Sequence, residues 1–171
     1  MTAATEIKKT QWLKLHLLGV AGGISWLGSS LTTFAVVLRD KDAVGPIGVS
    51  FLFMAMIVPT ILMAPVAGLL ADKFSTRALI PPLLVVMGLS NLTLAYVHDT
   101  WYTYVALALT ASAGTAVGAS FNAVLPTLAN PDDLPRVNGS QQTYSSLGTL
   151  FAPALGGLLV ASTGYFWPFV I

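Results

Sequence analysis

The sequence predicts an all-α fold in which a bundle of helices crosses a lipid bilayer several times. Hydrophobic residues make up 55% of the 171 residues and charged residues only 9%. Soluble domains contain about 25% charged residues, so this shortfall indicates a membrane protein. Residues 43–71 and 78–98 contain no Asp, Glu, Lys or Arg. As helices, apolar stretches of this length cross the roughly 30 Å hydrocarbon core of a bilayer.

The hydrophobic pattern predicts five complete membrane spans and the beginning of a sixth, near residues 13–38, 46–70, 78–97, 101–124, 139–162 and 165–171 onward. The first span follows Lys8, Lys9 and Lys14, and its apolar run continues past Leu31. A signal peptide has an apolar core of only about 7–15 residues, so we expect this span to stay in the membrane.

Polar or aromatic segments separate the later spans. A charged cluster at residues 72–77 divides the second span from the third, and Asp99 precedes the fourth. Residues 125–138 contain three prolines and predict an extended loop before the fifth span. Aromatic clusters at 101–104 and 165–167 begin the fourth and sixth spans, as is typical of membrane interfaces.

Basic residues in the loops predict the orientation. The N-terminus, the second-to-third loop and the fourth-to-fifth loop share one side and carry six Lys or Arg residues, whereas the other side carries only Arg39 and Lys41, in the first loop. The side with more basic residues normally faces the cytoplasm, so we expect a cytoplasmic N-terminus in the cell membrane.

The charged loop between the second and third spans carries a motif. Residues 68–80 read Gly-Leu-Leu-Ala-Asp-Lys-Phe-Ser-Thr-Arg-Ala-Leu-Ile. This resembles the signature Gly-x-Leu-Ala-Asp-Arg-x-Gly-Arg-Lys-x-x-Leu of major facilitator superfamily transporters, although Ser75 and Thr76 depart from it. The resemblance implies a gating loop of Gly68, Asp72, Lys73 and Arg77 that locks two halves of a transporter together. The alternative is an ordinary cytoplasmic loop, in which Lys73 and Arg77 only anchor the topology.

The fifth span carries a stripe of small residues. Gly148, Ala152 and Gly156 are spaced by four and share one helix face, and Pro153 can bend the helix. Together with Gly157, the segment resembles the antiporter signature Gly-Pro-x-x-Gly-Gly, with Ala152 in place of the first Gly. The resemblance implies exchange transport, and plain helix packing is the alternative.

Polar residues within the spans are candidates for lining a cavity, because a large amide in lipid is costly unless it is paired. They include Ser25, Ser29 and Thr32 on one face of the first span and Asn122 in the fourth. The resemblance favours these two helices as cavity lining. The fourth span lacks the Arg-x-x-Gln-Gly pattern of proton-coupled exporters, so nothing there indicates a proton site in this half.

The resemblance implies the N-terminal half of a twelve-helix carrier, since a helix ending at Ile171 would leave backbone groups unpaired in hydrocarbon. We expect alternating access by an exporter of drug-like or siderophore-like solutes, because residues 125–138 also resemble the equivalent loop of that branch. The alternatives are an importer or uniporter of a neutral metabolite such as a sugar, and a membrane scaffold that does not transport. The expected partners are the lipid bilayer, a small-molecule substrate and the C-terminal half of the same carrier.

Other function classes have little support. The chain has no cysteine and shows no enzyme motif or His cluster with metal spacing, so we expect no enzyme, metal site or cofactor. A net charge of +1 gives no basic field for nucleic acid.

Overall fold

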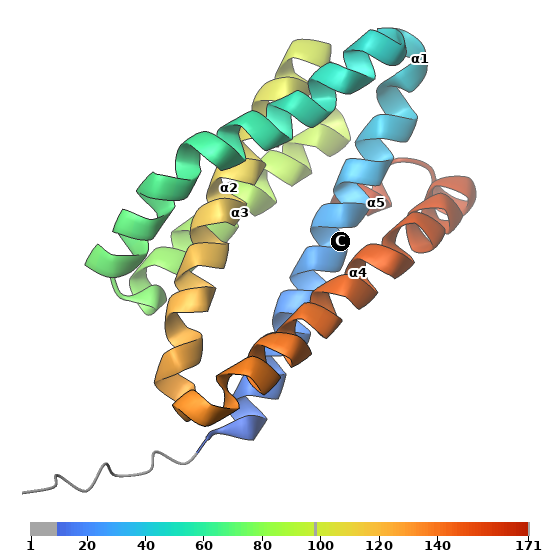
Figure 1. Ribbon diagram of the computed structural model, residues 1–171. Helices are drawn as coiled ribbons and strands as arrows, with labels where there is room; N and C mark the ends of the chain where they lie inside the picture. The colour runs from blue at the N-terminus through green and yellow to red at the C-terminus, as the bar shows by residue number, and fades with distance from the viewer. Residues whose placement is uncertain (1–9, 98, 171) are drawn as a thin grey trace, which may run out of the picture.

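The computed structural model describes residues 10–97 and 99–170, and within these residues it is helical and contains no strand (Figure 1). The helices are α1 (Trp12–Lys73), α2 (Thr76–Tyr96), α3 (Thr100–Leu128), the short 3-10 helix η1 (Pro131–Asp133), α4 (Leu134–Thr163) and α5 (Trp167–Val170). Four helical segments are long and apolar enough to cross a membrane. The predicted all-α, multi-pass membrane fold is therefore confirmed.

Helix α1 consists of two limbs that run in opposite directions. Gly45 interrupts it with φ +65° and ψ −177°, and in Figure 1 the chain turns back at the end of the blue limb and returns as the teal one. A positive φ is easily adopted by glycine, and Pro46 suits the first turn of the next helix. We call residues 12–44 the first limb and residues 46–73 the second limb. The predicted spans left residues 39–45 as a loop. This prediction is wrong, because the helix continues up to Gly45 and the chain reverses there.

Local signals place the ends of α3 and α4. The carboxylate of Asp99 accepts a hydrogen bond from the Tyr102 N–H at 2.9 Å and caps the start of α3. The predicted loop at 125–138 is too long, since α3 continues to Leu128 and α4 begins at Leu134. Pro126 lies in the last turn of α3, and Pro135 lies in the first turn of α4, where its missing N–H costs no helical hydrogen bond.

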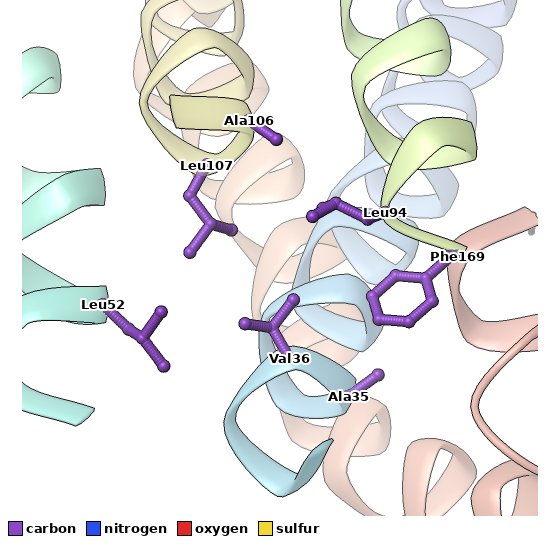
Figure 2. Packing of buried hydrophobic residues seen from close by; sticks show 7 residues of the cluster. All are labelled: Ala35, Val36, Leu52, Leu94, Ala106, Leu107 and Phe169. Atoms are coloured by element: carbon purple, nitrogen blue, oxygen red, sulfur yellow. The ribbon is translucent and has the colours of Figure 1, made fainter. Parts of the chain in front are cut away.

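Two apolar clusters hold the bundle together. The larger one joins α1, α2, α3 and α5 and is drawn in Figure 2; its buried members are Ala35, Val36, Leu52, Leu94, Ala106, Leu107 and Phe169. The smaller one joins the start of α1 to the connection between α3 and α4 through Leu15, Leu125, Ala129 and Val137. These two clusters position the first limb of α1 between α3 and α4.

Candidate functional site

One face of α4 packs closely against the first limb of α1. Gly148, Ala152 and Gly156 are all buried on this face. A Cβ atom on Gly148 would lie 2.9 Å from the Gly23 carbonyl oxygen and 3.1 Å from the Leu27 nitrogen. The two backbones therefore approach to a distance that only a glycine allows at this position.

The five residues of the antiporter-like motif do not all lie at this interface. Pro153 is exposed, and a Cβ atom on Gly157 would find no described atom within 4 Å. The three residues of the stripe thus pack against α1, while Pro153 and Gly157 lie outside the close contact.

The first limb contributes glycines of its own to the same interface. A Cβ atom on Gly19 would lie 2.5 Å from the ring of Tyr144, and one on Gly23 would lie 3.1 Å from the Tyr144 Cβ. The Tyr144 hydroxyl is hydrogen-bonded to Nδ1 of His16 at 2.9 Å. The glycines therefore leave room for one large aromatic side chain of α4.

A neighbouring face of α4 is polar. Asn138, Gln142, Ser145 and Thr149 follow one another at spacings of four, three and four, so they form a single stripe along the helix. We call these four residues the polar stripe. Because it lies beside the packed face, it follows the edge of the contact between α4 and the first limb.

The N-terminal part of the polar stripe lines a hollow between α3 and α4. The hollow has a volume of about 460 Å³ and is lined by Asn122, Leu125, Pro126, Leu134, Asn138, Gln141, Gln142 and Ser145. Four of these residues are amides, and none of the described lining residues is charged. Asn122, which the sequence marked as a cavity candidate, lies here. The Gln141 amide donates a hydrogen bond to the Leu15 carbonyl oxygen at 3.0 Å and is held in place.

The candidates from the first span lie elsewhere. Thr32 is buried and its hydroxyl donates to the Pro168 carbonyl oxygen at 3.5 Å, at the beginning of α5. The Ser29 hydroxyl donates to the carbonyl oxygen of Ser25 in its own helix. None of these three residues lines the hollow.

Trp26 is the residue of the first limb that reaches the polar stripe. Its indole N–H donates a hydrogen bond to the Thr149 hydroxyl oxygen at 2.7 Å. Sequence reasoning missed this residue. The available signal was a tryptophan in the middle of a span, whereas tryptophan in membrane proteins is enriched at the two interfaces.

The charged loop at residues 72–77 is exposed. α1 ends at Lys73 and α2 begins at Thr76, so the connection is very short. Asp72, Lys73 and Arg77 are all exposed, and within the described part of the chain none of these side chains forms an ion pair. A Cβ atom on Gly68 would meet no described atom within 4 Å. This end of the second limb is therefore open to contact from outside the described residues.

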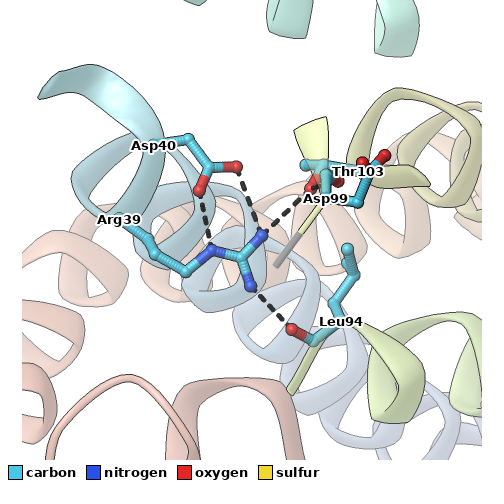
Figure 3. Close-up of polar contacts among 5 residues, drawn as sticks. All are labelled: Arg39, Asp40, Leu94, Asp99 and Thr103. Atoms are coloured by element: carbon cyan, nitrogen blue, oxygen red, sulfur yellow. Dashed lines mark hydrogen bonds and ion pairs between the residues drawn. The ribbon is translucent and has the colours of Figure 1, made fainter. Parts of the chain in front are cut away.

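At the opposite end of the bundle, Arg39 and Asp40 form a buried charged cluster. The guanidinium group donates to the Asp40 carboxylate, to the Leu94 carbonyl oxygen at 2.6 Å and to the Thr103 hydroxyl at 3.0 Å (Figure 3). It also lies 5.1 Å from the centre of the Phe169 ring. Arg39 was expected to be a loop residue, but its side chain is only 7% exposed and connects α1, α2, α3 and α5.

Comparison with known families agrees with this architecture. The sequence profile of the Major Facilitator Superfamily matches residues 18–171, which is most of the chain. The chain belongs to the Major Facilitator Superfamily. Together with the apolar helices, this membership establishes a multi-pass membrane protein of that superfamily.

A curated relative is the "Uncharacterized MFS-type transporter YfiS" of Bacillus subtilis (strain 168), to which the chain is 28% identical over 141 residues. The matched region covers 81% of this chain and 34% of the relative, so the chain spans about a third of the relative's length. No solved structure matches the chain significantly.

Proposed function

We propose that the chain forms part of a transporter that moves small molecules across the cell membrane by alternating access, and that this transporter exports amphipathic solutes. The observation that carries the proposal is the polar stripe of α4 together with the uncharged, amide-rich hollow beside Asn122. Membership in the superfamily and the printed name of the relative, an MFS-type transporter, support it.

The energetic argument concerns the environment of the polar stripe. An amide or hydroxyl that faces hydrocarbon loses its hydrogen bonds with water, so such groups normally face protein or a water-filled cavity. Asn138 and Gln142 are exposed in the described chain. We propose that they face a pathway that a second half of the protein closes from the other side, as in carriers built from two helix bundles.

The lining also bears on the kind of solute. Leu125, Pro126 and Leu134 give the hollow apolar walls, and its polar groups are neutral. This mixture fits a solute that has apolar surface and a few hydrogen-bonding groups. The described lining residues offer no counter-ion, so the hollow suits a solute that is neutral or carries no more than one delocalised charge.

One observation favours the importer alternative. The hollow brings together four amides, Asn122, Asn138, Gln141 and Gln142, and amides are suited to binding the hydroxyl groups of a neutral metabolite such as a sugar. The apolar walls of the hollow, which a strongly hydrated sugar does not need, make this the second candidate.

The gating role of the charged loop remains part of the proposal. The exposed Asp72 carboxylate lies near the end of the second limb, where it can meet a basic side chain or a helix N-terminus from the rest of the protein. Gly148 and Gly156 bring α4 into close contact with the first limb, and we propose that these two helical segments move as one unit. We propose that this unit rocks against the other half during exchange of solutes.

The experiment compares solutes directly in cells that express the full-length protein. Two rates are measured: efflux of ethidium, a planar amphipathic dye, and uptake of radiolabelled glucose. Their comparison separates the exporter from the importer. Ethidium efflux above that of an empty vector supports the exporter. Glucose uptake without dye efflux supports the importer, and neither activity over a panel of dyes and sugars supports the scaffold.

A further inference from the structure

We infer that Trp26 is a specificity-determining residue, whose indole ring forms an aromatic surface against which the transported solute stacks. The inference rests on the proposed function and deepens it, because it assigns an aromatic contact to the pathway beside the amide-rich hollow. It commits to a solute that carries a flat apolar or cationic ring.

The depth of Trp26 is the first observation. It lies 14 residues after Trp12 in the first limb, about 21 Å along the helix at 1.5 Å per residue. A side chain at this depth is far from the interface where tryptophan is usually found. Trp26 is nevertheless 53% exposed in the described chain.

The hydrogen bonding of Trp26 is the second observation. Its N–H donates to the Thr149 hydroxyl at 2.7 Å, and that hydroxyl in turn donates to the Ser145 carbonyl oxygen at 3.1 Å. The indole is thereby fixed at its edge, and its polar group is satisfied. This hydrogen bond uses only the edge of the ring and so does not occupy its two faces.

The space next to the indole is the third observation. Gly22 lies four residues earlier and so on the same side of the first limb. A Cβ atom there would find a single neighbour within 4 Å, Cε1 of Phe121 in α3 at 4.0 Å. Because Gly22 has no side chain, the first limb leaves room beside the indole on the side that faces α3.

The opposite side of the first limb has a different character. Leu13, Leu17, Val20 and Ile24 are exposed there, and they fall within one sector of the helix. Ile24 is separated from Trp26 by about 200° around the axis. The first limb thus has an apolar side suited to lipid and a second exposed side, which carries Trp26 and adjoins the polar stripe. Lipid therefore suits the Ile24 side, and the pathway suits the Trp26 side.

The chemistry of the ligand follows from these groups. An indole face attracts another aromatic ring by stacking and a cation by the charge distribution of its π-system. The nearby amides supply hydrogen-bond donors and acceptors. A solute with one flat ring and a few polar groups can stack on the indole and form hydrogen bonds with the amides.

Transport kinetics of the full-length protein test the inference, with ethidium as the probe. Trp26→Leu is expected to raise the KM for ethidium by about three- to tenfold with little change in kcat, the factor given by losing one aromatic contact. Trp26→Phe keeps an aromatic ring, so its KM for ethidium is expected to lie between those of the unaltered protein and Trp26→Leu. The matched control is Trp101→Leu, at a tryptophan that is 79% exposed in the first turn of α3, and its KM should equal that of the unaltered protein. An unchanged KM in Trp26→Leu overturns the inference.

A second measurement does not depend on transport. Residues 1–171 contain no cysteine, so Trp26→Cys and Ile24→Cys can each be introduced into a full-length protein whose other cysteines have been replaced. A membrane-impermeant, water-soluble maleimide should label Cys at position 26 and leave Cys at position 24 unlabelled. Absence of labelling at position 26, or equal labelling at both, overturns the inference. If the unaltered protein moves another dye of the panel but not ethidium, the KM comparison is made with that dye. If it moves no dye, the exporter proposal fails, and equal labelling at positions 24 and 26 would overturn the present inference separately.

Discussion

Arg39 and Asp40 are adjacent in sequence and form a bidentate ion pair, with Nε to Oδ1 at 2.8 Å and Nη2 to Oδ2 at 3.2 Å (Figure 3). Their side chains are only 7% and 12% exposed. The other guanidinium hydrogen bonds reach Leu94 in α2 and Thr103 in α3. The pair therefore fastens one end of the bundle, where α1, α2 and α3 meet.

The first prediction concerns this cluster. Arg39→Ala leaves the Asp40 carboxylate buried without its partner, and loss of one member of a buried ion pair costs about 3–5 kcal/mol of stability. The purified full-length protein should therefore unfold at a clearly lower temperature in detergent. Lys41→Ala, which changes an exposed neighbour, is the control and should leave the unfolding temperature unchanged. Equal unfolding temperatures for both variants would contradict a bracing role.

The second prediction concerns the contact between α4 and the first limb. Gly148→Ala places a Cβ atom 2.9 Å from a backbone oxygen, so the helices must move apart, at a cost of about 1–3 kcal/mol. Gly157→Ala adds the same atom where no described neighbour lies within 4 Å, and it should be neutral or slightly stabilising. Thermal unfolding followed by size-exclusion chromatography compares the two variants. A Gly148→Ala protein as stable as Gly157→Ala would show that the close approach is not required.

The third prediction tests the gating loop. Asp72→Ala should reduce transport severalfold by the full-length protein while its amount in the membrane stays the same, because the exposed carboxylate is not needed for packing within the described chain. Asp132→Ala, at an exposed acidic residue before α4, is the control and should transport normally. Normal transport by Asp72→Ala would leave the loop with only a topological role.

The fourth prediction tests the orientation. Thr76 begins α2, and Asp99 caps the start of α3, so a membrane-crossing α2 separates them. Epitope tags inserted at Thr76 and at Asp99 in the full-length protein should be detected from opposite sides, with the Thr76 tag reached only after cells are permeabilised. Detection of both tags in intact cells would contradict the cytoplasmic N-terminus and the predicted membrane topology.

The sequence by itself determined the class of the protein and several local features. The scarcity of charge and the long continuous apolar runs indicated membrane helices, because a helix pairs its backbone groups within its own segment in hydrocarbon. The spacing of Gly148, Ala152 and Gly156 placed them on one helix face, since helical periodicity depends only on the local chain.

Only the tertiary structure decided which faces meet. It turned Thr32 toward α5 and Trp26 toward Thr149, and it buried Arg39 against α2 and α3. The physical reason is that these contacts join residues 55 to 136 positions apart, and their geometry depends on how whole helices pack. A pattern along one helix defines its polar and apolar sides, but the packing of its neighbours defines which side becomes a pathway.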